Sequence, residues 1–176
     1  LYSSAASDVY KRQAQKDRHG RLPEAPFGSM INELTGNEME FYDLLLPEEL
    51  GKLRMDGKEY TWNTWGEILK PGKDSQVWAT YTQEFYEGKP AVTTRKLGKG
   101  TVTYVGVDST DGLLEKDILK KLYAQLNIPV MDLPYGVTLE YRNGMGIVLN
   151  YTDKPYKFVL PSGAKVLIGE PVIPTA

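Results

Sequence analysis

Few residues in this chain are suited to acid–base or nucleophilic chemistry. The sequence has one histidine, His19, and no cysteine. Without cysteine there is no thiolate nucleophile, no disulfide and no thiolate-bound zinc or iron–sulfur cluster. His19 follows Asp17 and Arg18, with which it can form a small polar cluster. Since it has no recognisable Ser, Cys or second His partner, we do not interpret it as a catalytic group.

Two pairs of carboxylates are candidates for general acid–base catalysis, Glu48 with Glu49 and Asp108 with Asp111. The two glutamates follow Pro47 in a polar stretch, which favours a solvated helix start. The two aspartates lie between a predicted strand and a predicted helix, where α/β sites cluster, although capping of the helix is the simpler interpretation. We therefore predict no catalytic, cofactor-binding or metal-ligating residue in this chain, and no cofactor.

Two short motifs favour structural roles. Lys99 lies within Gly98-Lys99-Gly100-Thr101, but a phosphate-binding loop needs four residues between its glycines and a helix after them. A strand is predicted after Gly100, so this segment is interpreted as a hairpin turn. Asn150-Tyr151-Thr152 fits the glycosylation tripeptide, a pattern that is common by chance.

Aromatic side chains suggest either packing or sugar stacking. The chain has 3 Trp, 12 Tyr and 4 Phe, and six of these residues lie close together in sequence: Trp62, Trp65, Trp78, Tyr81, Phe85 and Tyr86. We favour core or interface packing for them over direct ligand contact. A sugar-binding module would instead need an exposed row of aromatic side chains near the C-terminus, for which the candidates are Tyr135, Tyr141, Tyr151 and Tyr156.

The composition is that of a globular protein. Of 176 residues, 41% are apolar and 25% charged, which fits one domain or one domain plus a small satellite. The formal net charge of −2 gives no electrostatic reason to expect a nucleic acid or an anionic membrane as partner. No apolar stretch approaches the roughly 18 residues of a membrane span. Gly and Pro together make up 28 residues (17 and 11), which indicates many turns and short strands.

The elements that position these residues follow from periodicity and turn signals. Residues 1–13 resemble a translated sequencing adaptor, with a natural tail as the alternative, and we exclude them from the fold. Ser29 is expected to cap a short helix that Gly36 ends. Hairpins are predicted at Asp56-Gly57 and at Gly98-Lys99-Gly100. A helical stripe spans residues 109–125, with Thr110 or Asp111 as its cap and Glu115 in its first turn.

After Pro134 only strands and turns are expected. Strands over residues 137–142 and 146–150 flank Asn143-Gly144, which is a strong hairpin signal. Strands over residues 156–160 and 165–168 flank Pro161-Ser162-Gly163. These four strands predict a small antiparallel β-domain over residues 131–176, cut short at its end, preceded by a first domain over residues 14–130.

A succession of motifs resembles a known family. Phe85-Tyr86-Glu87-Gly88-Lys89-Pro90-Ala91-Val92 is followed by Leu97-Gly98-Lys99-Gly100 and Tyr104-Val105-Gly106, and then by Pro134-Tyr135-Gly136-Val137 and Tyr141-Arg142. The combination is fairly specific, although each piece alone is weak. From about Lys16 to the end, the chain resembles the C-terminal half of a bacterial β-galactosidase of glycoside hydrolase family 42.

The resemblance implies a fold, partners and an activity. In that family a (β/α)8 barrel carries two catalytic glutamates, an α/β domain mediates trimer formation, and a small antiparallel β-domain follows. By similarity, we expect residues 14–130 to be the later part of an α/β domain, flavodoxin-like or glutamine-amidotransferase-like. The barrel lies upstream of everything in this sequence, so neither glutamate is present here. The intact protein would be longer, form a homotrimer and hydrolyse terminal non-reducing β-D-galactosides, with a cytoplasmic location.

We therefore expect a non-catalytic fragment of a β-galactosidase that acts in oligomerisation and scaffolding. A carbohydrate-binding or protein-interaction module is the alternative. An amidotransferase-like regulator is a third possibility, disfavoured because such an enzyme needs a nucleophile that this chain lacks.

Overall fold

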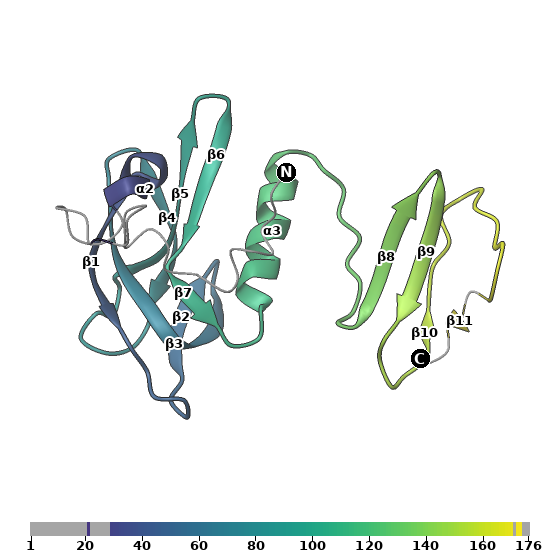
Figure 1. Cartoon of the computed structure of the whole chain (residues 1–176), viewed down its shortest axis with the longest axis horizontal. Coiled ribbons are helices and arrows are strands. Elements are labelled where there is room, and N and C mark those ends of the chain that lie inside the picture. The colour runs from purple at the N-terminus through teal and green to yellow at the C-terminus, as the bar shows by residue number, and fades with distance from the viewer. Residues whose placement is uncertain (1–20, 22–28, 171, 174–176) are drawn as a thin grey trace. The chain divides into compact units, whose positions relative to one another are not determined.

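A computed structural model describes residue 21, residues 29–170 and residues 172–173 (Figure 1). The chain divides into two compact units, Leu1–Leu119 and Lys120–Ala176. The division into domains at residues 130 and 131 that the sequence suggests stays a prediction.

The first unit is a seven-stranded sheet in which every pairing is antiparallel. Its strands are β1 (Asn37–Asp43), β2 (Gly51–Met55), β3 (Lys58–Pro71), β4 (Ser75–Tyr81), β5 (Pro90–Leu97), β6 (Gly100–Val105) and β7 (Val107–Ser109). Their order is β1-β3-β2-β4-β5-β6, and β7 pairs with β3. The long strand β3 pairs with β2 along its first half and with β1 along its second half. Strand β3 therefore joins the two halves of the sheet.

Gly106 closes the sheet on itself. It lies between β6, which pairs with β5, and β7, which pairs with β3. Its N–H donates to the Ala91 carbonyl at 2.9 Å, and its own carbonyl accepts from the Glu67 N–H at 2.6 Å. A Cβ at position 106 would lie 3.1 Å from the carbonyl oxygens of both Ala91 and Glu67. A residue without a side chain therefore suits the closure point.

Trp62 fills the middle of this sheet, and its indole lies against two glycines. A Cβ at Gly51 would lie 2.2 Å from the indole Nε1, and a Cβ at Gly66 would lie 2.7 Å from Cη2. The Tyr81 ring meets the indole edge-on, with 5.7 Å between ring centroids. The indole therefore lies directly against the strand backbone at two positions where any side chain would overlap it.

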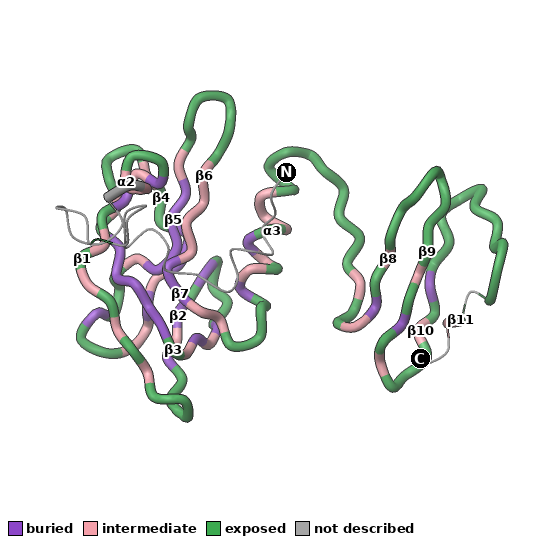
Figure 2. Tube along the Cα trace, in the orientation of Figure 1, coloured by how far each residue is buried: buried purple, intermediate pink, exposed green. Residues whose placement is uncertain are grey.

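Burial alternates along β2, as in a half-buried strand, whereas β3 and β5 each contain an unbroken run of buried residues. Figure 2 shows many buried residues on β2 to β5 and a few on the helix over Leu113–Gln125. The fully buried large side chains include Leu53, Ile68, Leu69, Tyr81, Tyr86 and Leu114. In contrast, the β5–β6 hairpin tip and the β2–β3 turn are exposed.

Two helices lie in the described part of the chain, α2 (Ser29–Thr35) and α3 (Leu113–Gln125). Gly36 ends α2 with a φ of 69°, as its sequence position predicts. In the first unit, α3 buries Leu114 and Ile118. Asp117 on the same helix accepts hydrogen bonds from Lys58 Nζ at 2.6 Å and from the Tyr60 hydroxyl at 2.8 Å. These contacts hold the helix to the β2–β3 hairpin.

The second unit contains two small antiparallel pairs. Strands β8 (Val137–Arg142) and β9 (Met145–Asn150) form a hairpin, and β10 (Tyr156–Lys157) pairs with β11 (Val172–Ile173). Among the described residues of this unit, Val137, Asn150 and Phe158 are buried, whereas most other apolar side chains are exposed.

The expected flavodoxin-like or glutamine-amidotransferase-like α/β fold is wrong. A parallel sheet needs crossover connections of a dozen or more residues between its strands. In this sheet β2 and β3 are joined by Asp56-Gly57, and β5 and β6 by Gly98-Lys99, so neighbouring strands run in opposite directions. The long helix α3 follows β7 and joins no two strands of the first sheet. The first unit is therefore an antiparallel β structure with helices at its ends.

Most of the predicted turns are present in the structure, although the predicted fold class is wrong. The hairpins at Asp56-Gly57, Gly98-Lys99 and Asn143-Gly144 are confirmed. The predicted hairpin around Pro161-Ser162-Gly163 is wrong in its strands, since β10 covers only Tyr156–Lys157 and pairs with β11 instead. The turn itself is present, because the Ala164 N–H donates to the Pro161 carbonyl at 3.0 Å.

Replacing Gly51 by alanine tests the packing of Trp62. The new methyl group would overlap the indole, so we expect Gly51→Ala to lower the free energy of unfolding by about 1–3 kcal/mol. Urea unfolding followed by tryptophan fluorescence measures the change. Gly100→Ala is the matched control, because the nearest atom to its Cβ would be the Leu97 carbonyl oxygen at 3.8 Å. Equal stability of both variants and the parent chain would show that the indole does not lie on Gly51.

Candidate binding site

In each carboxylate pair that the sequence suggested, one member accepts a hydrogen bond from a nearby backbone N–H. Glu48 and Glu49 lie in an exposed turn, and Glu49 Oε2 accepts a hydrogen bond from the Leu46 N–H at 3.2 Å. They do not begin a helix, so that interpretation is wrong. Asp111 Oδ1 accepts from the Leu113 N–H at 3.0 Å, which confirms it as a cap of α3. Nothing in these contacts assigns Asp108 or Asp111 a chemical role.

Glu115 also takes part in the start of α3. It lies in the first turn, and its carboxylate hydrogen bonds to the Ser109 hydroxyl. Ser109 Oγ in turn accepts from the Gly112 N–H at 3.1 Å. The polar residues at this strand–helix junction thus bind the backbone and one another.

The motifs that contain Lys99 and Asn150 both lie at turns. Lys99 is exposed at the tip of the β5–β6 hairpin, as the turn interpretation requires. Asn150 is 5% exposed, and its Nδ2 donates to the Lys154 carbonyl at 2.8 Å. Its Oδ1 accepts from the Thr152 N–H at 3.0 Å. This amide organises the turn after β9, which argues against a glycosylation site. Asp17, Arg18 and His19 lie outside the described residues.

Five of the six clustered aromatic residues are buried, namely Trp62, Trp65, Trp78, Tyr81 and Tyr86. The packing interpretation holds for these five side chains. Phe85 differs, because 83% of its surface is exposed. Its ring is stacked on that of Phe41, with 5.5 Å between centroids, and meets the Tyr86 ring edge-on.

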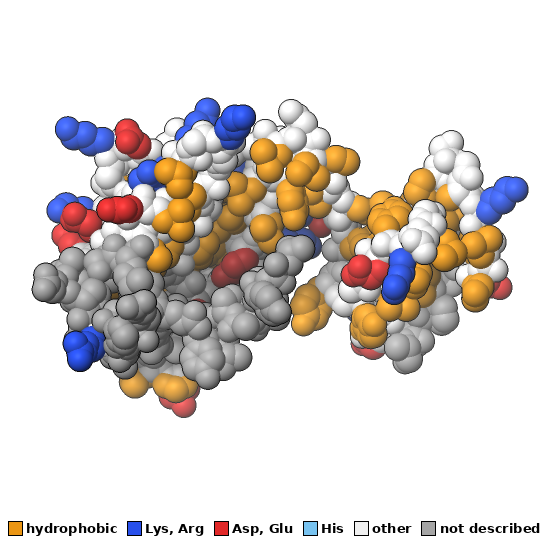
Figure 3. All heavy atoms as spheres, turned by 45° about the horizontal axis from the view of Figure 1, so that its top comes forward, with side chains coloured by type: hydrophobic (Ala, Val, Ile, Leu, Met, Phe, Trp, Pro, Cys, Tyr) orange, Lys and Arg blue, Asp and Glu red, His pale blue; other side chains and the backbone are white. Residues whose placement is uncertain are grey.

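Apolar side chains of the second unit are exposed in large number, and Figure 3 shows them gathered on its surface. Tyr135, Tyr141 and Tyr151 are exposed and Tyr156 is half-buried. Tyr141 lies on β8, whereas Tyr135 and Tyr151 flank the hairpin. Exposure makes these side chains available to a ligand or partner.

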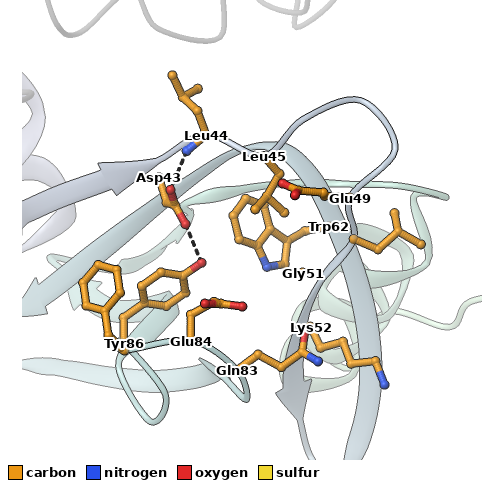
Figure 4. Close-up of a pocket in the computed structure, with 12 residues that line it drawn as sticks. Asp43, Leu44, Leu45, Glu49, Gly51, Lys52, Trp62, Gln83, Glu84 and Tyr86 are labelled. Atoms are coloured by element: carbon orange, nitrogen blue, oxygen red, sulfur yellow. Dashed lines mark hydrogen bonds between the residues drawn. The ribbon is translucent and has the colours of Figure 1, made fainter.

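A pocket of about 550 Å³ opens at one end of the first sheet (Figure 4). It lies between the end of β1 with the segment that follows, the start of β2, and the β4–β5 loop. Its lining residues are Asp43, Leu44, Leu45, Glu49, Leu50, Gly51, Lys52, Trp62, Gln83, Glu84, Phe85 and Tyr86. The volume lies within the range of about 300–1,000 Å³ that is usual for small-molecule sites.

Asp43 is held in place at the wall of this pocket. Its Oδ2 accepts from the Tyr86 hydroxyl at 2.6 Å, and its Oδ1 accepts from the Leu44 N–H at 2.9 Å (Figure 4). Two further carboxylates, Glu49 and Glu84, line the same pocket. A carboxylate accepts about four hydrogen bonds, so all three keep acceptor positions beyond these contacts.

The indole nitrogen of Trp62 lies at the same pocket without a hydrogen-bond partner. Trp62 is 1% exposed, and its Nε1 is a buried donor that has no acceptor among the described residues. In Figure 4 the indole lies beside Leu45, with its nitrogen on the side of Gly51. An unsatisfied buried donor costs about 1–3 kcal/mol. The pocket thus combines carboxylate acceptors with one orphaned donor.

A second polar cluster, which the sequence does not reveal, surrounds Glu67. This carboxylate is 7% exposed, and it accepts from Trp65 Nε1 at 3.0 Å and from the Tyr104 hydroxyl at 2.5 Å. The Tyr81 hydroxyl donates to the Glu67 carbonyl at 2.8 Å. Position 67 follows Gly66 in an apolar strand, and only the closure of the sheet brings Tyr104 to it. The cluster therefore supplies hydrogen-bond donors to a buried acid.

Burial and nearby carboxylates act together on four tyrosines. Burial raises the pKa of Tyr81 and of Tyr104 well above the ordinary value of 10, and the Glu67 carboxylate adds to this effect. Burial likewise raises the pKa of Tyr60 and of Tyr86, assisted by their hydrogen bonds to Asp117 and Asp43. In each case the neutral phenol is the form that the fold favours.

Residues 21, 29–170 and 172–173 hold no group of three or more His, Cys, Asp or Glu residues arranged to bind a metal ion. In the same part of the chain, neither helix has the length and apolarity that a membrane crossing needs.

Comparison with known proteins gives one consistent family. Residues 11–134 match the family described as the β-galactosidase trimerisation domain. The β-galactosidase BgaH of Haloferax lucentense is 28% identical over 162 residues, which are 92% of this chain and 24% of that protein. The β-galactosidase BgaA of Clostridium cellulovorans is 39% identical over 93 residues, covering 50% of this chain and 14% of that protein.

Solved structures agree with the fold. The β-galactosidase of Halorubrum lacusprofundi is 26% identical with a TM-score of 0.71, over 80% of this chain and 21% of that one. The β-galactosidase of Marinomonas ef1 has a TM-score of 0.76 at 21% identity, over 94% of this chain and 23% of that one. This chain spans a quarter or less of the length of these relatives.

The four shifted tyrosines make stability fall at high pH. Their pKa values are raised in the folded state, so the unfolded chain loses these protons first. The stabilisation is complete below pH 10 and declines as the pH rises above it. We expect Tyr104→Phe to make this decline shallower, as measured by urea unfolding between pH 8 and about 11. Tyr135→Phe, at an exposed position, should leave it unchanged, and identical slopes for both variants would contradict the burial of Tyr104.

Proposed function

This chain belongs to the β-galactosidase trimerisation domain family, and we propose that it is the oligomerisation part of a longer β-galactosidase. The match of the family over residues 11–134 carries this proposal. The similarity of the chain to β-galactosidases from an archaeon and from bacteria supports it.

In this proposal the chain holds copies of the protein together, and another part of the polypeptide performs catalysis. Three copies would assemble as a homotrimer. Substrates would be terminal non-reducing β-D-galactosides, bound by a barrel outside this sequence. No nucleic-acid or membrane partner is required, and the location would be cytoplasmic.

The two parts of the chain would contribute differently. We assign self-association to residues 14–130, which include the closed antiparallel sheet of the first unit. Residues 131–176, with the β8–β9 hairpin, would form a small terminal β-domain. The contacts around Glu67 are internal to the first unit, so they support its shape rather than chemistry.

Self-association of the purified 176-residue chain tests the first half of this proposal. We expect sedimentation equilibrium to give the mass of three chains at micromolar concentration, with dissociation on dilution. A molecular mass of one chain at every concentration up to the solubility limit would contradict the proposed self-association. Gly51→Ala serves to show whether the associated state needs the folded first unit, since it disturbs the Trp62 packing.

Hydrolysis of a chromogenic β-galactoside tests the second half. Asp111, Glu49 and Glu67 take part in a cap, a turn and a buried cluster, and in this proposal the catalytic barrel lies outside this sequence. We therefore expect no release of the chromophore above the buffer rate at pH 5 to 8. Turnover that is proportional to the concentration of this chain and survives repeated purification would show that catalysis resides here.

A further inference from the structure

We propose that the pocket at the end of β1 binds a saccharide, with a pyranose ring against Phe85 and hydroxyl groups on Asp43, Glu84 and the Trp62 indole N–H. The inference goes beyond self-association and does not depend on it. It rests on the lining of the pocket, which combines three kinds of group that contact a bound sugar: hydrogen-bond acceptors, a hydrogen-bond donor and an aromatic ring.

The first kind is the set of carboxylate acceptors. Asp43 is fixed by Tyr86 and by the Leu44 N–H, so its oxygens are positioned before a ligand arrives. Glu84 lies in the β4–β5 loop and has a backbone φ of 66°. This backbone conformation sets the direction in which its side chain leaves the loop. Hydrogen bonds to charged acceptors are stronger than neutral ones. Pairs of neighbouring sugar hydroxyls are suitable donors for such carboxylates.

The second kind is a donor without a partner. The buried Trp62 Nε1 needs an acceptor, which an ammonium ion or a metal cation does not provide. A hydroxyl group donates to a carboxylate and accepts from an N–H at the same time. The lining therefore selects a neutral polyhydroxylated molecule over a cation. Trp62 lines the pocket but is 1% exposed, so a ligand oxygen reaches this N–H only if the pocket wall beside it shifts.

The third kind is an exposed aromatic face. Phe85 is 83% exposed although it lies next to the buried Tyr86, and its ring is supported by stacking on Phe41. An exposed, supported ring offers apolar surface to the C–H face of a pyranose. The pocket volume of about 550 Å³ accommodates one or two sugar rings.

The indole N–H of Trp62 provides a direct readout in the whole chain. Three tryptophans give three indole signals in a 1H–15N correlation spectrum, and Trp62→Phe identifies one of them. The test is to add D-galactose, D-glucose, lactose or cellobiose to the labelled chain, up to about 100 mM. Choline and calcium chloride serve as cationic probes in separate titrations. We expect at least one sugar to shift the Trp62 signal in a saturable manner, while the Trp65 signal, whose N–H donates to Glu67, stays in place.

Variants at exposed lining residues test the contacts without disturbing the core. We expect Phe85→Ala and Glu84→Gln each to weaken binding at least about fivefold, consistent with the loss of one aromatic contact or one charged acceptor. Glu87→Gln is the matched control, since Glu87 is exposed in the same loop but does not line the pocket. Shifts by choline or calcium alone, no saturable shift by any sugar, or equal affinity in all three variants would overturn the proposal.

Discussion

The burial of one indole constrains the whole first unit. Trp62 lies where a Cβ at Gly51 or at Gly66 would overlap it, so β2 and both halves of β3 approach closer than side chains normally permit. The same strand then turns to pair with β1 on one side and β7 on the other. Gly106 completes the arrangement, since it hydrogen bonds to both Ala91 and Glu67. The closed antiparallel sheet therefore depends on three glycines and one large ring, and loss of any contact loosens its core.

Closure of the sheet also explains how a carboxylate and several phenols are buried together. The Glu67 side chain receives hydrogen bonds from Trp65 and Tyr104, which come from strands far apart in sequence. Buried polar groups are tolerated when each has partners. A cluster of this kind favours one position of β6 relative to β3, because a shift of β6 by one residue would remove the Tyr104 donor. The buried polar residues of the first unit thus specify its shape.

The pocket end of the sheet has a different character from the Glu67 cluster. There the donor of Trp62 has no partner, and Phe85 is exposed beside the buried Tyr86. Local polar groups that the fold leaves unsatisfied, next to exposed apolar surface, are features of binding surfaces. Membership of the β-galactosidase trimerisation domain family supports the proposal of self-association. It does not by itself account for a pocket that contains an orphaned indole N–H, which is why the two features lead to separate proposals.

Local features of this protein follow from its sequence alone, whereas the arrangement of its strands does not. Asp56-Gly57, Asn143-Gly144 and the Asp111 cap act through the backbone conformation of a few neighbouring residues, and each appears where its signal lies. The family resemblance also follows from motifs in the printed sequence. The flavodoxin-like expectation was wrong because strand direction depends on which strands pair, and pairing is decided by contacts between distant residues. For the same reason only the tertiary structure brings Tyr104 to Glu67, and Phe85 to the pocket of Trp62.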